Sequence, residues 1–233
     1  MTAFSRLFSL VLAKKYTLKT VELWFFLDER LEKHLSLDTY TWLKMTEDRT
    51  IEKQEFRQGG WDNEYYDCVF EHCDFSNLEI KDVYFENCRF RFCNFSLSKL
   101  WCNFRDAQFF ECKMSGADFS GVSRLAVSFR FEKTNLSYAS FIGVKMKSAK
   151  FVACSLNETY FDQADVSSSV FDRCDMERTS FYQTNLEKAD FSTAFNFTID
   201  PVSNRLKKAV FSVEGLKGLV SHLGIVIKEP GEL

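Results

Sequence analysis

The chain has 233 residues, of which 45% are apolar and 26 are phenylalanine, and its formal net charge is -3 at pH 7. This composition supplies enough apolar side chains for a large core and argues against a general nucleic-acid binder, which would carry a basic stripe. With only nine glycines and two prolines, most turns must be made by other residues.

Residues 1–44 lie outside any repeat. The apolar run Phe4–Leu12 ends at Lys14 and Lys15, so it is too short to span a membrane, and it lacks a small-residue cleavage site for export. A loose helical period from Val21 to Leu35 predicts a helical cap on the element that follows. Alternatively, residues 1–44 are an over-extended start, because Met45 opens a segment that looks like an ordinary N-terminus.

A large apolar residue, the centre, recurs at every fifth position from Phe70 to Phe191, about 24 times, with a small residue two positions before each. A helix would rotate successive centres by roughly 140°, and a strand would place alternate centres on opposite faces. Neither buries them all. Each five-residue unit must therefore turn the chain itself, so that all centres face the inside of a continuous coil.

The repeat has a degenerate beginning and two breaks. Phe56, Trp61 and Tyr66 form an imperfect entry. The interval from Leu100 to Phe104 is four residues, which predicts a kink or a missing corner residue. The interval from Phe119 to Phe131 is twelve, which predicts a bulge or short loop over residues 120–130 that the coil accommodates.

All eight cysteines fall at the small position two residues before a centre: Cys68, Cys73, Cys88, Cys93, Cys102, Cys112, Cys154 and Cys174. Pairs that are 20 residues apart would stack on neighbouring coils, which leaves disulfides or a metal ladder as alternatives. No Cys-x-x-Cys knuckle or Cys/His pairing accompanies them, so we expect free thiols that fill the core. Buried free thiols fit a reducing cytoplasm.

The repeat ends within residues 194–201, and residues 204–210 are expected to be an extended crossing. Ser212 can cap a helix that runs to about Leu223, with Gly224 as its stop. An apolar stripe on this helix would seal the last coil and contact a second copy: Leu216, Leu219, Val220 and Leu223. We therefore divide the chain into an N-terminal cap or over-extended start (1–50), a repeat region (51–199) and a C-terminal crossing with a capping and dimerisation helix (200–233).

Several repeats resemble the pentapeptide-repeat family, over roughly 125 residues: C-D-F-S at 73–76, A-D-F-S at 117–120, N-L-S-Y-A-S-F at 135–141 and T-N-L-E-K-A-D-F at 184–191. This resemblance implies an all-β fold, a right-handed, four-sided β-helix solenoid with four pentapeptides per coil. On that geometry the centres make roughly six coils, closed by helical caps at both ends.

No phosphate-binding loop, hydrolase motif or metalloprotease motif is present, and the three histidines form no constellation. We therefore predict a non-enzymatic protein with no catalytic residues, no metal site and no cofactor. Residues 151–200 contain nine acidic and three basic residues. This acidic segment, the repeat style and the C-terminal Asp200-Pro201 region resemble the quinolone-resistance branch of the family.

That branch implies a cytoplasmic, DNA-mimicking homodimer that occupies the DNA-binding site of gyrase or topoisomerase IV, protects it from fluoroquinolones, and binds neither nucleic acid nor membrane. The acids expected to replace phosphates are Asp162, Asp165, Asp172, Asp175, Glu177, Glu187 and Asp190. The alternative is a scaffold, protein-interaction or immunity module without a topoisomerase role. A continuous acidic face would favour mimicry, and scattered charges or an apolar face would favour another protein partner.

Overall fold

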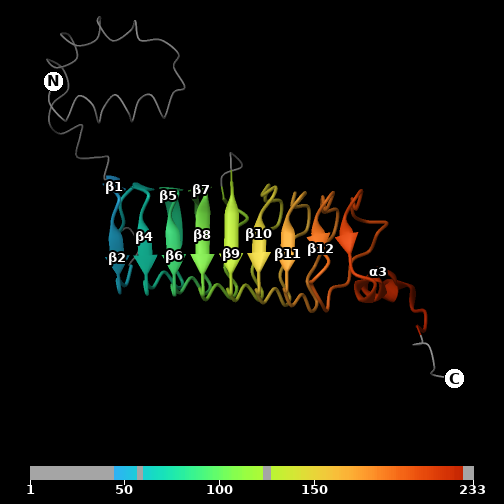
Figure 1. The fold of residues 1–233 in the computed structure, drawn as a ribbon. Helices are drawn as coiled ribbons and strands as arrows, with labels where there is room; N and C mark the ends of the chain where they lie inside the picture. Colours follow the sequence, from blue (N-terminus) through green and yellow to red (C-terminus); the bar gives the residue numbers. More distant parts are fainter. Residues whose placement is uncertain (1–44, 57–59, 123–126, 228–233) are drawn as a thin grey trace, which may run out of the picture. The chain divides into compact units, whose positions relative to one another are not determined.

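The computed structural model describes residues 45–56, 60–122 and 127–227, which form a parallel β-solenoid whose strands stack from coil to coil (Figure 1). A four-stranded parallel sheet contains β1 (Met45–Glu47), β3 (Glu64–Tyr66), β5 (Glu79–Glu86) and β7 (Lys99–Arg105). A nine-stranded parallel sheet contains β2 (Thr50–Glu52), β4 (Val69–Glu71), β6 (Arg89–Arg91), β8 (Ala107–Phe110), β9 (Phe129–Glu132), β10 (Lys150–Val152), β11 (Val170–Asp172), β12 (Asp190–Phe191) and β13 (Val210–Phe211).

The solenoid is longer than the six coils predicted, since the nine stacked strands of the larger sheet correspond to eight turns. At its start, Met45 already pairs with Glu64, so the first coil begins before the boundary expected at residue 51. At its end, Asn185 pairs with Arg205, and Asp190 pairs with Val210. The extended crossing expected over residues 204–210 is therefore wrong, since this segment completes another coil. The cap and over-extended start proposed for residues 1–44 lie outside the described residues.

The core consists of phenylalanine rings stacked along the solenoid, as the five-residue period predicts. Phe151 is fully buried and stacks on Phe131 and Phe171 with ring centroids 5.2 Å and 4.9 Å apart. A neighbouring column contains Phe141 and Phe161, whose centroids are 5.1 Å apart. The two columns meet edge to face, as between Phe151 and Phe161 at 5.8 Å and 88°, which is a favourable aromatic geometry.

The corners of the coil use a left-handed residue two positions after the centre, and 24 of these are not glycine, which explains the low glycine content. The residue before the centre assists this turn where it is Asp or Asn. The Oδ1 of Asp74 accepts a hydrogen bond from the Ser76 N–H at 2.9 Å, and Asp118 does the same with Ser120. The recurring D-F-S motif is therefore a corner motif.

The first of the two breaks in the repeat is visible. The pairing of β5 with β7 shifts by one residue between Lys81 and Tyr84, because β7 lacks the corner residue that Asp82 supplies in β5 with a φ of 56°. This confirms the missing residue predicted near Trp101. In the second break, residues 123–126 are outside the described part, while Val122 and Val127 on either side are buried.

The C-terminal helix begins and ends as predicted. It consists of a 3-10 turn (Glu214–Leu216), α3 (Lys217–Val220) and a second 3-10 turn (Ser221–Leu223). The Ser212 Oγ accepts the Gly215 N–H at 3.0 Å, and Gly224 ends the helix with a φ of 66°. Gly218 lies so close to Phe197 that a Cβ there would be 2.2 Å from the Phe197 carbonyl oxygen. The helix thus packs directly on the last coil.

All eight cysteines are free and buried, which confirms the core-filling prediction. The Cys88 thiol donates to the Tyr65 carbonyl oxygen at 3.4 Å, and burial raises the pKa of Cys88 to about 12. Within the described residues, no group of three or more His, Cys, Asp or Glu side chains could hold a metal ion. No helix in this part of the chain is long and apolar enough to cross a membrane.

Candidate partner-binding faces

The four stacks of pentapeptides define four faces, which we name by the centres beneath them. Face A is the nine-stranded sheet, over Phe90, Phe131 and Phe151. Face B lies over Phe95, Leu136 and Leu156. Face C lies over Leu100, Phe119, Phe141, Phe161 and Phe181. Face D lies over Tyr65, Phe85, Met146, Val166 and Leu186. Along the chain they follow in the order D, A, B, C, so faces A and C point in opposite directions.

The seven predicted acids are not brought together, because they are distributed over all four faces. Asp172 and Asp190 lie on face A, Asp175 and Glu177 on face B, Asp162 on face C, and Asp165 and Glu187 on face D. At most two of them share a face. These charges are therefore scattered, which is the arrangement that favours another protein partner.

Three of these acids form ion pairs within the chain. Asp172 pairs with Arg173 at 2.9 Å, Glu187 with Arg205 at 2.7 Å, and Asp165 with Lys147 at 3.5 Å. Hydrogen bonding from Arg173 holds the pKa of Asp172 below its usual range. Partnered in this way, these carboxylates are less available as phosphate substitutes.

Three others accept hydrogen bonds that belong to the fold. Asp190 accepts the Ser192 N–H at 2.9 Å in a corner, Asp162 accepts the Ser180 hydroxyl at 2.6 Å, and Asp175 accepts the Asn196 amide at 2.8 Å. These contacts join neighbouring coils or close turns. The identity of the acids at these positions therefore has a structural explanation.

A denser acidic group, which the sequence analysis missed, lies on face D of the first coils. Residues 45–87 contain twelve acidic and four basic residues. Glu47 lies opposite Tyr66, and Tyr66 lies opposite Glu86, on neighbouring parallel strands. The Tyr66 hydroxyl donates a hydrogen bond to the Glu64 carboxylate at 2.8 Å. We call this group the acidic ladder: Glu47, Asp48, Glu64, Asp67 and Glu86. Counting charges within residues 45–87 would have found it.

Face C carries large exposed side chains and few charges. Trp101, Ile142, Tyr160 and Tyr182 are exposed on it, with Tyr182 at 54%. Its outward positions from Asp118 to Ser203, all of which the structure describes, contain three aspartates and no lysine or arginine. The other outward residues are mainly Ser, Tyr, Gln and Gly.

Two glycines shape the edge of this face. A Cβ on Gly121 would lie 2.0 Å from the Trp101 Cδ1, so the indole rests on the bare backbone of the next coil. Leu97, at the corner between faces B and C, covers Gly116 in the same way, since a Cβ on Gly116 would lie 2.8 Å from the Leu97 Cδ2. Lys81 lies 4.5 Å from the centre of the Trp101 ring on its other side. Trp101 is therefore fixed on the surface.

The predicted dimerisation stripe is divided between the core and the surface. Leu219 packs against the core of the last coil. Leu216 and Leu223 are exposed at 50% and 59%. Further apolar side chains around them are exposed as well: Val213, Ile225, Val226 and Ile227. An apolar surface thus remains at this end of the described chain.

A family model for pentapeptide repeats matches the chain in eight copies, over residues 102–123 and 154–192. In the second segment equivalent positions recur every 20 residues, as at Asp165 and Asn185. Among curated protein sequences, none matches the chain significantly.

Solved structures with the same fold are similar at low sequence identity. HetL, a pentapeptide-repeat protein involved in heterocyst differentiation regulation from the cyanobacterium Nostoc sp. strain PCC 7120, is 15% identical with a TM-score of 0.52, and the match covers 77% of this chain and 93% of HetL. A trypsin-treated variant of QnrB1, a plasmid-mediated fluoroquinolone resistance protein, is 20% identical with a TM-score of 0.49, and the match covers 79% of this chain and 100% of that one. At 15% identity the likeness to HetL concerns the fold alone.

Proposed function

We propose that this chain is a pentapeptide-repeat protein that acts as a non-catalytic scaffold and binds a partner protein through face C. The observation that supports this role is the set of exposed aromatic and apolar side chains on a face whose described outward positions from Asp118 to Ser203 contain no lysine or arginine. The centres of protein interfaces are enriched in aromatic residues and depleted of charge. Tyrosine also contributes contact area at low entropic cost, while serine and glycine adapt to the partner.

The stacked coils provide the rigid support that such a face needs. Tyr160 and Ser180 lie in pairing register on neighbouring coils, and the Ser180 N–H donates to the Thr159 carbonyl oxygen at 2.8 Å. Each outward side chain is thus held in a lattice with a spacing of about 4.8 Å. A preorganised surface of this kind loses little entropy on binding.

The test compares protein capture by face variants from an extract of the source cells. We expect the double variant Tyr160→Lys, Tyr182→Lys to lose at least about tenfold of the captured partner, because interfacial tyrosines are frequent binding hot spots. The matched control is Phe195→Lys, which changes an equally exposed aromatic on face B. Equal capture by the wild type and the face C variant would contradict the proposal.

A second candidate function is topoisomerase binding by DNA mimicry, and the acidic ladder on face D favours it. Its five carboxylates extend over three coils, or about 14 Å, which is about one charge per 3 Å. This is roughly half the charge density of a DNA duplex. The ion pair of Glu86 with Arg105 at 3.6 Å reduces the net negative charge of the ladder further. We therefore rank this function second.

A gyrase supercoiling assay with and without a fluoroquinolone tests the second candidate. Mimicry predicts inhibition or drug protection that is lost in Glu47→Gln, Glu64→Gln and retained in Asp172→Asn, Glu187→Gln, which removes the same number of acids from the C-terminal coils. No effect of the wild-type protein on the enzyme would end this candidate.

We also propose a homodimer through the C-terminal end and a cytoplasmic location. The exposed Leu216 and Leu223 support the dimer, and eight unpaired cysteines suit a reducing compartment. Sedimentation analysis should give a dimer for the wild type and a monomer for Leu216→Lys, Leu223→Lys. A monomeric wild type would refute the dimer.

A further inference from the structure

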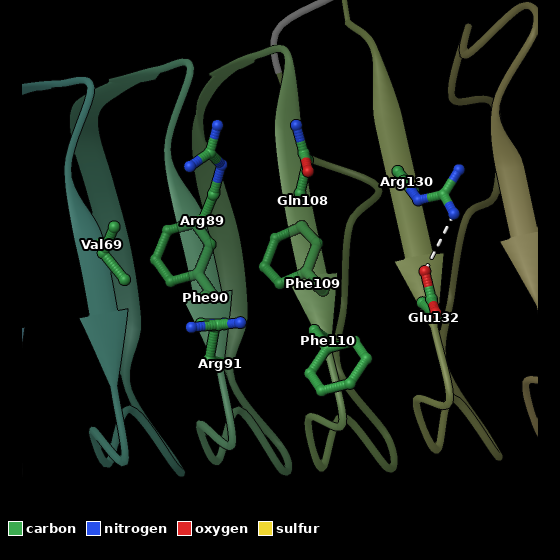
Figure 2. Close-up of a pocket in the computed structure, with 9 residues that line it drawn as sticks. All are labelled: Val69, Arg89, Phe90, Arg91, Gln108, Phe109, Phe110, Arg130 and Glu132. Atoms are coloured by element: carbon green, nitrogen blue, oxygen red, sulfur yellow. Dashed lines mark hydrogen bonds and ion pairs between the residues drawn. The ribbon is translucent and has the colours of Figure 1, made fainter.

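Face A contains a shallow groove where arginines lie next to the half-buried ring of Phe110. It has a volume of about 330 Å³ and crosses β4, β6, β8 and β9. Figure 2 shows Arg89, Gln108 and Arg130 in one row across neighbouring strands and Arg91, Phe110 and Glu132 in a second row below it. The groove lies on the side of the solenoid opposite face C.

The first row presents cations that the chain itself does not neutralise fully. Within the described residues no carboxylate lies within ion-pair distance of Arg89 or of Lys150, the next residue of this row beyond Arg130. Arg130 pairs with Glu132 on its own strand at 2.9 Å. Arginine presents a planar fork of donors that suits carboxylate oxygens.

The second row continues into an aromatic shelf. Phe92 is 40% exposed and stacks on His72 with ring centroids 4.9 Å apart, and its edge contacts Phe110 at 5.8 Å. Lys133 lies 5.4 Å from the centre of the Phe110 ring. An apolar ligand group would thus meet a ring surface bordered by cations.

Phe92 occupies a corner of the coil with a φ of 54°, the left-handed conformation that the other corners share. Asn or Gly would adopt this conformation more readily than a bulky side chain. The Phe92 ring is 40% exposed, so it is accessible to a ligand beside the arginines.

We propose that this groove binds an acidic segment of a second protein, with carboxylates on Arg89 and Arg130 and an apolar side chain on Phe92 and Phe110. Glu71 and Glu132 lie on the same face, so a phosphodiester chain, with a charge on every unit, would be repelled at both. A polypeptide can place its carboxylates opposite the arginines alone. Charge complementarity therefore favours a peptide over a nucleic acid.

The spacing of the arginines suggests the spacing of the acids. Arg89 and Arg130 are separated by two strand intervals, which is about 9.6 Å. A polyproline II segment repeats its orientation every three residues, over about 9.3 Å. The ligand is thus an acidic-x-x-acidic segment that runs across the strands, with an apolar residue between or beside the acids.

The test measures binding of short labelled peptides that contain Glu-Pro-Phe-Glu. We expect binding that weakens as salt rises, and a loss of at least about tenfold in the variant Arg89→Gln, Arg130→Gln. The matched control Lys207→Gln, Lys208→Gln removes two charges from face D and should change the affinity by less than about twofold. Phe92→Asn should weaken binding while the melting temperature stays the same or rises, since Asn accepts the left-handed conformation.

Three results would overturn the proposal. One is the absence of peptide binding at concentrations up to about 1 mM. Another is an equal loss of affinity in the arginine variant and the lysine control, which would mean non-specific attraction. The third is tighter binding of a short single-stranded oligonucleotide than of the peptide at the same arginines. The proposal does not depend on face C, because its variants lie on the opposite side.

Discussion

At the residue scale, the phenylalanine centres explain most of the stability of the solenoid and none of its recognition. In the column from Phe70 to Phe211, each inner ring stacks on its equivalents in the coils before and after it, so a truncation leaves a gap that affects three coils. Outward residues such as Lys150 contact mainly solvent and their strand neighbours. Core and surface substitutions should therefore have very different effects.

Phe151→Ala should lower the free energy of unfolding by about 3–5 kcal/mol, because it creates a cavity between Phe131 and Phe171. Lys150→Ala, one residue away and exposed, should change it by less than about 0.5 kcal/mol. Urea unfolding measures both. A loss below about 1 kcal/mol for Phe151→Ala would show that the ring column is not the principal support.

Buried thiols should make the fold less stable at alkaline pH. Burial raises the pKa of Cys88 to about 12 from an ordinary value of 9.0 and also raises that of Cys102. Above pH 9 the unfolded chain therefore loses thiol protons that the folded chain retains, and stability falls as pH rises from 9 towards 12.

Each such thiol contributes up to about 1.4 kcal/mol per pH unit in that window. Unfolding free energies at pH 8 and pH 10 should show the fall, and Cys88→Ala should reduce it. A stability that is constant across this interval would mean that the thiols ionise in the folded state.

At the element scale, the five-residue period predicted the coil, the inward cysteines and the missing corner near Trp101, while Ser212 and Gly224 predicted the C-terminal helix. The period did not predict the length of the solenoid, because the first and last coils pair through the backbone although a centre is polar, as at Thr46, or the period is interrupted, as between Phe191 and Leu206. Backbone pairing between coils does not require an ideal repeat.

The C-terminal helix offers a test at this scale. Gly218→Ala should destabilise the helix by about 1–3 kcal/mol, since the new Cβ would overlap the Phe197 carbonyl oxygen at 2.2 Å. Glu214→Ala, on the exposed start of the helix, is the comparison. Amide exchange of residues 214–223 should accelerate in the first variant only. Unchanged exchange would mean that the helix is not held by Phe197.

At the scale of the whole molecule, recognition depends on which outward residues share a face. The acids of residues 151–200 looked like one group in the sequence, but neighbouring pentapeptides lie on different faces, and equivalent positions recur only about every 20 residues. The four-residue and twelve-residue intervals shift this count further. The candidate acids could therefore be identified from the sequence, whereas their distribution over faces and their ion pairs could not.

The same geometry gives each face a separate chemistry. Face C is aromatic and contains few charges, face A combines arginines with exposed phenylalanines, and face D is acidic in the first coils. A scaffold of this kind can hold one partner on face C while another occupies face A. Recognition therefore depends on the faces, and stability depends on the centres.

Photo-crosslinking tests the central claim most directly. A photoreactive phenylalanine analogue is placed at Tyr182 on face C or at Phe195 on face B, where both side chains are about half exposed. We predict that irradiation in the source cells gives one discrete protein adduct from position 182 and none from position 195. The same adduct from both positions, or no adduct from position 182, would contradict the assignment of face C as the binding face.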